Sequence, residues 1–254
     1  MSVRLLEPKF VERVWGTTEL QPLFPNQTNK IGEVWFDAGP GFPLLVKFIF
    51  TSEKLSVQVH PDDTYAKAVE NSRGKTEMWH ILSAEPGATI SLGFKESVTK
   101  DQIRAAIADK TVEALLNEIP VKPGDTYYAE AGTVHAIGAG IALCEIQQNS
   151  DVTYRLYDYD RGRELHLEKG LSVSSTIPYN GAREFPVRCE HFITDLLEIS
   201  QRTGCLGGIL IVLEGTGKLD GTPVKPGDVA LIGSPTQIEP DGRLKLIHTL
   251  SEYS

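Results

Sequence analysis

The same five residues occur twice in the chain, and this repeat limits the folds that the sequence can adopt. Val-Lys-Pro-Gly-Asp spans residues 121–125 and recurs at 224–228. Pro-Gly-Asp alone is a common turn sequence, so chance also explains the match. When the two pentads are superposed, His135 in the first copy falls on Ile238 in the second. We therefore predict two related units, with polar chemistry at this position only in the first.

Strands and turns dominate the predicted structure. The 23 glycines and 15 prolines fall between short runs of β-branched and aromatic residues, which is typical of a mainly β protein. The clearest strand-like runs cover residues 44–49, 55–60 and 76–82. The first 45 residues are interrupted by Pro, Gly and Asn. We therefore expect these residues to be irregular, apart from one strand at 32–37.

Helical periodicity is limited to short segments. Residues 99–117 place apolar side chains at helical spacing after Thr99, a favourable N-cap, and predict one helix. A shorter helix-like stretch follows His60 at 62–71. Residues 172–184 have the composition of a linker between the two units.

Charge and cysteine content restrict the partners. The formal net charge of −9, without a run of Lys and Arg, offers no attraction for nucleic acid or an anionic membrane surface. Cys144, Cys189 and Cys205 are too few and too widely spaced to predict a disulfide framework. No signal peptide or membrane span of about 20 apolar residues is apparent. We expect a cytoplasmic protein, either a monomer or a homodimer.

Polar residues with metal-ligand chemistry occupy two strand-like segments. Side chains alternate between the faces of a strand, so Gln58 and His60 lie opposite an apolar row. The same alternation places Lys75 and Glu77 on one face and His80 on the other. Glu77 and His80 are therefore not expected to act together.

A third segment supplies another imidazole, His135, flanked by glycines after the first Pro-Gly-Asp. Two imidazoles, one carboxylate and one amide oxygen suit a divalent ion such as zinc, with a position left for substrate. A single histidine in a strand is more often a hydrogen-bonded residue than a ligand. From residue types and spacing alone, both interpretations remain open for the set Gln58, His60, Glu77 and His135.

The segment 145–161 is dense in polar and aromatic groups. Alternation predicts that Tyr154 and Leu156 share one face and that Arg155 and Tyr157 share the other. A surface strand with exposed Arg and Tyr explains the same pattern.

Several long segments together resemble the type I mannose-6-phosphate isomerases, in particular their short bacterial form. They are LSVQVHPDD at 55–63, GKTEMWHIL at 74–82, AGTVHAIGAG at 131–140, EIQQNSDVTYRLYDYDR at 145–161 and RELHL at 163–167. The resemblance implies a pair of cupin, or jelly-roll β-barrel, units with a short helical element. It implies a catalytic unit at 1–172 and a degenerate unit without metal at 173–254. The additional helical domain of longer members has no counterpart here.

The resemblance also implies residue roles. It places Gln58, His60, Glu77 and His135 at the positions that bind one zinc ion, and Arg155 at the position of a catalytic arginine. The implied reaction interconverts mannose 6-phosphate and fructose 6-phosphate through an enediol(ate) intermediate.

That reaction requires a base near C1 and C2 and cationic groups for the phosphate and the developing negative charge. Glu145, Lys75 and a water on the metal are candidates for the base, and the sequence does not select one of them. Arg155 is the first candidate for the anion and Lys75 the second, while Lys47 and Arg161 are weaker candidates.

Two other functions fit part of this pattern. A metal-dependent dioxygenase could use similar ligands, but Arg155 and Lys75 would then lack a role. A cupin that binds sugar phosphates without catalysis is the second alternative. A DNA-binding regulator would require a helix-turn-helix and a basic face, and the sequence shows neither.

Overall fold

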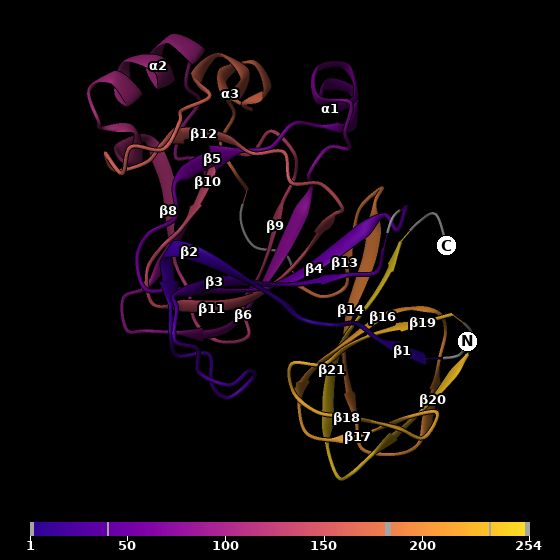
Figure 1. Ribbon diagram of the computed structural model, residues 1–254. Helices are drawn as coiled ribbons and strands as arrows, with labels where there is room; N and C mark the ends of the chain where they lie inside the picture. Colours follow the sequence, from indigo (N-terminus) through magenta and orange to yellow (C-terminus); the bar gives the residue numbers. More distant parts are fainter. Residues whose placement is uncertain (1–2, 40, 181–183, 234, 252–254) are drawn as a thin grey trace.

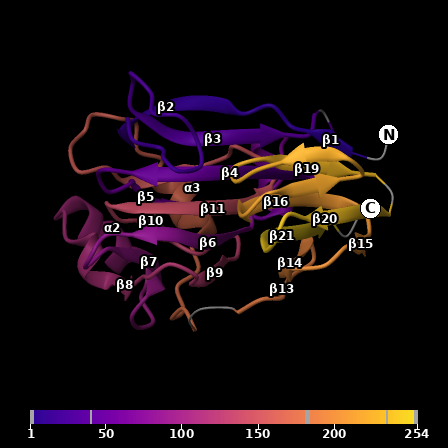
Figure 2. The same ribbon diagram turned by 90° about the horizontal axis from the view of Figure 1, so that it is seen from below.

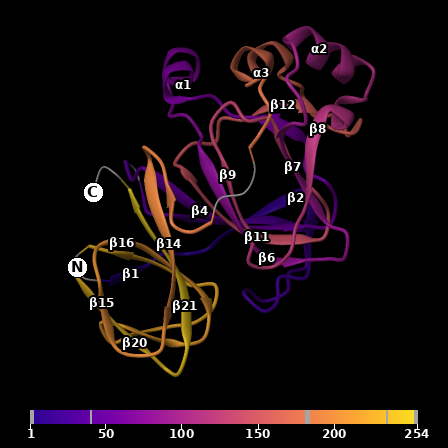
Figure 3. The ribbon, with the colours of Figure 1, turned by 180° about the vertical axis from the view of Figure 1, so that it is seen from behind.

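The computed structural model describes residues 3–39, 41–180, 184–233 and 235–251. Two β-barrel units lie side by side, and helices cover the end of the N-terminal barrel that lies away from the C-terminal barrel (Figures 1 and 3). The prediction of a mainly β fold is confirmed. Among the described residues, no helix is both long and apolar enough to cross a membrane.

Two antiparallel sheets form the N-terminal barrel. The larger contains, in spatial order, β2 (Lys9–Thr17), β3 (Ile31–Asp37), β4 (Leu44–Thr51), β11 (Ile141–Gln148), β6 (Glu77–Ala84) and β9 (Thr126–Ala129). The smaller contains β12 (Tyr154–Tyr157), β5 (Val57–Val59), β10 (His135–Ile137), β7 (Thr89–Phe94) and β8 (Leu116–Pro120). The chain crosses from the larger sheet to the smaller one after β4, β6, β9 and β11, which is the pattern of a double-sheet jelly roll.

The C-terminal barrel repeats this arrangement. One sheet contains β1 (Val3–Leu5), β19 (Val229–Ile232), β16 (Gly208–Glu214), β21 (Leu244–Ser251), β14 (Phe192–Ile199) and β13 (Val187–Arg188). The other contains β15 (Thr203–Cys205), β20 (Thr236–Pro240), β17 (Gly217–Leu219) and β18 (Thr222–Val224). Strand β1 comes from the start of the chain and pairs with β19, as Figure 2 shows.

A shared apolar layer joins the barrels. The outer face of the larger N-terminal sheet, including Phe36 and Phe48, forms one cluster with Phe192 and Ile209 of the C-terminal barrel. Phe24 contributes a ring 5.3 Å from that of Phe48. The inner face of the same N-terminal sheet is thereby left free to carry the polar side chains of the barrel interior.

The helices differ in part from the sequence-based prediction. Helix α1 (Asp63–Glu70) begins at the N-cap Asp62 and agrees with the expected stretch. Helix α2 (Lys100–Ala108) begins at Thr99, which forms a capping box with Gln102.

The prediction that this second helix continues to residue 117 is wrong. Lys110 adopts a left-handed conformation with φ of 58°, which ends the helix. A 3-10 turn, η1 (Val112–Leu115), and strand β8 follow.

Other parts of the chain contain more structure than predicted. The expectation of irregular structure over the first 45 residues is wrong, because two further strands, β1 and β2, precede the expected strand β3. Helix α3 (Leu167–Val173) ends at the start of the expected linker. Residues 181–183 of that linker lie outside the described residues.

The layer between the barrels should account for much of the stability. Phe48→Ala is expected to lower the free energy of unfolding by about 3–5 kcal/mol, because a fully buried ring is lost from a packed layer. The measurement is urea denaturation followed by fluorescence. Leu206→Ala, at a side chain that is 67% exposed, is the matched control and should change the free energy by less than about 0.5 kcal/mol. Equal effects of the two substitutions would contradict this account of the interface.

Candidate functional site

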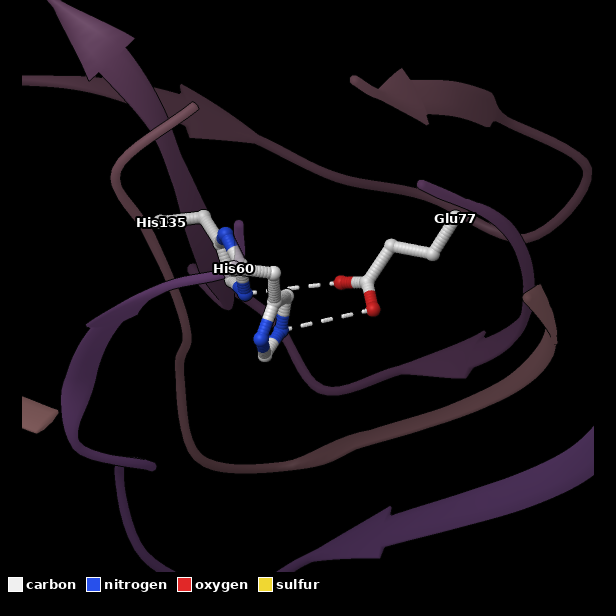
Figure 4. A group of neighbouring side chains, drawn as sticks. All are labelled: His60, Glu77 and His135. Carbon is white, nitrogen blue, oxygen red and sulfur yellow. Dashed lines mark ion pairs between the residues drawn. The ribbon is translucent and has the colours of Figure 1, made fainter. Parts of the chain in front are cut away.

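Three side chains with metal-ligand chemistry converge inside the N-terminal barrel. His60 directly follows β5, Glu77 is the first residue of β6, and His135 is the first residue of β10. The Nε2 atoms of His60 and His135 lie 3.5 and 3.4 Å from the two carboxylate oxygens of Glu77. One ligand atom from each residue lies within 4.8 Å of the others. Figure 4 shows the three side chains pointing toward one another. The structure thus brings together residues that are up to 75 positions apart in the sequence.

Both imidazoles are held in the form that binds a metal. Burial, with the nearby Lys75 and His135, lowers the pKa of His60 well below its usual value. Burial also lowers the pKa of His135 to about 4. In the neutral rings, Nδ1 of each donates a proton to a backbone carbonyl, at 2.9 Å from His60 to Val152 and 2.8 Å from His135 to Thr133. The Nε2 lone pairs therefore face Glu77.

Glu77 fits a divalent cation for a separate reason. Its side chain is 1% exposed, and among the described residues neither carboxylate oxygen has a hydrogen-bond donor in satisfactory geometry. A buried carboxylate without such partners is costly unless a cation compensates it. Lys75 supplies part of that charge, with Nζ 2.8 Å from Glu77 and 3.0 Å from Nε2 of His60. The donor set of two nitrogens and a carboxylate suits zinc.

Lys75 remains charged in this setting. Burial by itself would lower the pKa of the ammonium group, but the carboxylates of Glu77 and Glu145 outweigh that effect and raise the pKa above its usual value.

Strand register aligns two more candidates with His135. Arg155 of β12 lies opposite Gln58 of β5, and Gln58 lies opposite His135 of β10. Residues that are directly opposite in antiparallel strands share a face. Gln58 places its amide 3.2 Å from Nε2 of His135. The side chains of Arg155, Gln58 and His135 consequently form a row along the inner face of the smaller sheet.

The expected position of Tyr157 is wrong. A bulge between Arg155 and Tyr157 places Tyr157 opposite Val57, so Tyr157 packs with Leu156 and not beside Arg155. An extra residue in a strand reverses the alternation beyond it.

The facing sheet supplies a second row of side chains. Glu145 of β11 lies between Lys47 of β4 and Trp79 of β6, and Lys47 lies opposite Trp35 of β3. Trp79 donates from Nε1 to Glu145 at 3.0 Å, and Nζ of Lys47 lies 3.5 Å from the other oxygen of Glu145. The Lys47 ammonium group also lies 4.6 Å from the centre of the Trp35 ring. Cation–π contact and ion pairing thus stabilise one buried charge.

Lys47, a weaker candidate from the sequence, contacts the carboxylate of Glu145 in the structure. Trp79 also contacts this carboxylate and was not predicted as a site residue. Lys47 is the one charged residue in the completely buried strand β4. A lone lysine in an apolar strand is the sequence signal that identifies it, because lysine is rarely buried without a partner. No comparable signal marks Trp79, whose apolar ring is expected in any core.

Gln58, Lys47, Lys75, Glu145 and Arg155 line a cavity of about 440 Å³ that opens to solvent. This volume is within the range of small-molecule sites. Its walls carry five cationic side chains, which are Arg13, Lys47, Lys75, Arg155 and Arg163. Four acidic side chains, Glu12, Glu33, Glu145 and Asp151, also line the cavity. The lining thus carries one more cationic than acidic side chain, in a protein of net charge −9.

The sequence is also similar to those of known proteins. The chain is 41% identical over 219 residues to the probable mannose-6-phosphate isomerase GmuF of Bacillus subtilis, an alignment that covers 68% of each chain. The chain belongs to the mannose-6-phosphate isomerase family. A second relative, mannose-6-phosphate isomerase of Streptococcus mutans, is 48% identical over 138 residues, covering 52% of this chain and 43% of the relative. No model of a protein family matches the sequence.

Solved structures of this family have the same fold. A mannose 6-phosphate isomerase from B. subtilis superposes with a TM-score of 0.87 at 30% identity, covering 98% of this chain and all of the other. A putative mannosephosphate isomerase from Archaeoglobus fulgidus superposes with a TM-score of 0.83 at 21% identity, covering 98% and 97% of the two chains. The second likeness shows the fold alone.

The three-residue centre predicts selective loss of metal on mutation. We expect Glu77→Ala to weaken zinc binding by at least about 10- to 100-fold, since loss of a residue that only orients a ligand already costs that much. The measurement is zinc content after dialysis against a competing chelator. His80→Gln is the matched control. His80 belongs to the same strand as Glu77 and is also buried, but its side chain lies on the opposite face and bonds Thr126 of β9. Retention of zinc by Glu77→Ala would show that the centre does not bind it.

Proposed function

We propose that this protein is a zinc-dependent isomerase that interconverts mannose 6-phosphate and fructose 6-phosphate. The observation that carries the proposal is the convergence of His60, Glu77 and His135. Lys75 contacts this group and, together with Arg155, lines the adjoining cavity. The names of the relatives support this substrate. The zinc assignment follows from the donor set, with Gln58 as a fourth, weaker ligand.

The reaction moves a proton between C1 and C2 of the sugar through an enediol(ate), which places negative charge on oxygen. Zinc, when bound, supplies a Lewis acid for the carbonyl and hydroxyl oxygens of the substrate. The chain must then provide a base, positive charge near the oxygens and a site for the phosphate.

Glu145 is the best candidate for the base. Its side chain is buried, and its Oε1 atom has no hydrogen-bond partner among the described residues. An ionised carboxylate only accepts protons and hydrogen bonds, as a base must. Trp79 and Lys47 fix its carboxylate from two sides. Lys75 already pairs with Glu77, so we assign it to the stabilisation of negative charge on the sugar oxygens.

Arg155 is the leading candidate for contact with the anion that develops in the reaction. Its guanidinium group lines the cavity, and its Nε atom is buried without a hydrogen-bond partner among the described residues. Arg163 lines the same wall and can add charge for the phosphate.

We further propose that the catalytic unit is residues 1–172, apart from the contribution of β1 to the other barrel, and that residues 173–254 bind no metal. In support, Ile238 is fully buried in the apolar core of the C-terminal barrel. The proposed site residues all come from one chain, so a monomer supplies a complete set. The free cysteines Cys144, Cys189 and Cys205 support a reducing compartment such as the cytoplasm.

The direct test is conversion of mannose 6-phosphate by the purified chain. Activity should be lost after removal of metal with a chelator and should return when zinc is added. Iron added in place of zinc, with oxygen consumption as readout, tests the dioxygenase alternative. Absence of conversion by zinc-loaded protein that still binds the sugar phosphate would favour a binding protein without catalysis.

Arg155→Ala should lower turnover by at least about 100-fold, because a charged donor to the transition state is lost. Bound zinc should stay at the wild-type level, since Arg155 is not one of the three converging residues. The measurements are steady-state kinetics and metal analysis. Arg243→Ala, at an exposed arginine of the C-terminal barrel, is the control and should keep full activity. Unchanged turnover of Arg155→Ala would remove Arg155 from the proposed catalytic set.

A further inference from the structure

Arg155 lies on an edge strand, so one side of its backbone has no partner in the sheet. Strand β12 is the last strand of the smaller N-terminal sheet, and within the described part of the chain it pairs only with β5. The bulge after Arg155 interrupts even this pairing. A residue on such an edge needs another contact to fix its position.

His166 makes that contact through its backbone and its side chain. The backbone N–H of His166 donates to the carbonyl oxygen of Arg155 at 2.7 Å. The backbone N–H of Arg155 donates to Nδ1 of the His166 ring at 3.2 Å. The imidazole therefore acts as the acceptor that a neighbouring strand would otherwise supply, and this requires the proton of the neutral ring to be on Nε2.

The same segment also holds the Arg155 guanidinium group. Nη1 of Arg155 donates to the backbone carbonyl oxygen of Glu164 at 2.8 Å. Residues 164–166 thus fix both the main chain and the side chain of Arg155.

His166 is itself firmly anchored. It is the N-cap residue of α3, yet its side chain makes no capping bond and is directed to Arg155 instead. Gly170 of that helix donates its N–H to the carbonyl oxygen of His166 at 2.8 Å. A Cβ atom at Gly170 would lie 2.5 Å from the Leu156 side chain, so glycine lets α3 approach β12 closely.

We propose that His166 is a positioning residue that sets the place of Arg155 in the cavity, an inference that rests on the proposed isomerase function. His166 is not among the residues that line the cavity, and its ring accepts the backbone N–H of Arg155, which does line it. It acts through Arg155 alone. The proposal gives a function to the histidine of the Arg-Glu-Leu-His-Leu segment, which the proposed catalytic groups do not use.

Substitutions at position 166 separate this role from general stability. His166→Ala should lower kcat by about 10-fold or more, since small displacements of a catalytic group are costly. His166→Asn should recover most of the loss, because an asparagine oxygen can take the place of Nδ1. His166→Gln places its oxygen further out and should not recover it. Zinc content should stay unchanged in all three. Full activity of His166→Ala, or equal activity of the Asn and Gln variants, would overturn the proposal.

A double-mutant cycle tests the route of the effect. In the Arg155→Ala background, His166→Ala should cause no further loss of kcat, whereas independent or purely structural effects would multiply. His248→Ala is the control, because His248 is a half-buried histidine of the other barrel whose ring also bonds the backbone, with Nε2 donating to the carbonyl oxygen of Gly207. It should leave kcat at the wild-type value.

The wild-type assay distinguishes the two levels of inference. Without isomerase activity in the wild-type protein, the proposed function fails, and His166 has no reaction to support. With wild-type activity but multiplying losses in the cycle, only the role of His166 fails.

Discussion

The register between β12, β5 and β10 is the constraint on which the candidate site depends. It aligns Arg155, Gln58 and His135 across three strands that are distant in the sequence. A shift by one residue would turn each side chain of the shifted strand to the opposite face, away from Glu77. Apolar residues fix this register, because Val57 and Val59 pack in the cluster beneath the helices. Burial on one face of the sheet therefore determines the chemistry on the other.

The barrel interior compensates its buried charges with one another. Lys47 pairs with Glu145, and Lys75 pairs with Glu77. In each pair, at least one carboxylate oxygen of the glutamate lacks a hydrogen-bond donor among the described residues. Buried pairs with such defects contribute little to stability and are better explained by function. Stability comes instead from apolar packing, which includes the layer between the barrels and a separate cluster around Trp79 and Ile81 on the inner face of the larger N-terminal sheet.

Local sequence patterns predicted what depends on local geometry. Alternation correctly placed Glu77 and His80 on opposite faces of β6, and Thr99 marked the start of α2. The end of α2 was not predictable from spacing, because the apolar residues after Lys110 serve η1 and β8 equally well. The bulge after Arg155 and the role of Lys47 arise from pairing with distant strands. Such pairings leave no periodic signal in one segment.

Strand β1 gives the C-terminal barrel a discontinuous sequence. Val3 pairs with Ile232, and the N–H of Leu6 donates to Val229. During synthesis, β1 leaves the ribosome long before β19 exists, so it must wait while the N-terminal barrel acquires its strands. Until β1 docks, β19 is an open edge that can pair with another chain. Once β1 docks, the edge of this sheet is a strand of only three residues, and so short an edge offers little backbone for another chain to pair with.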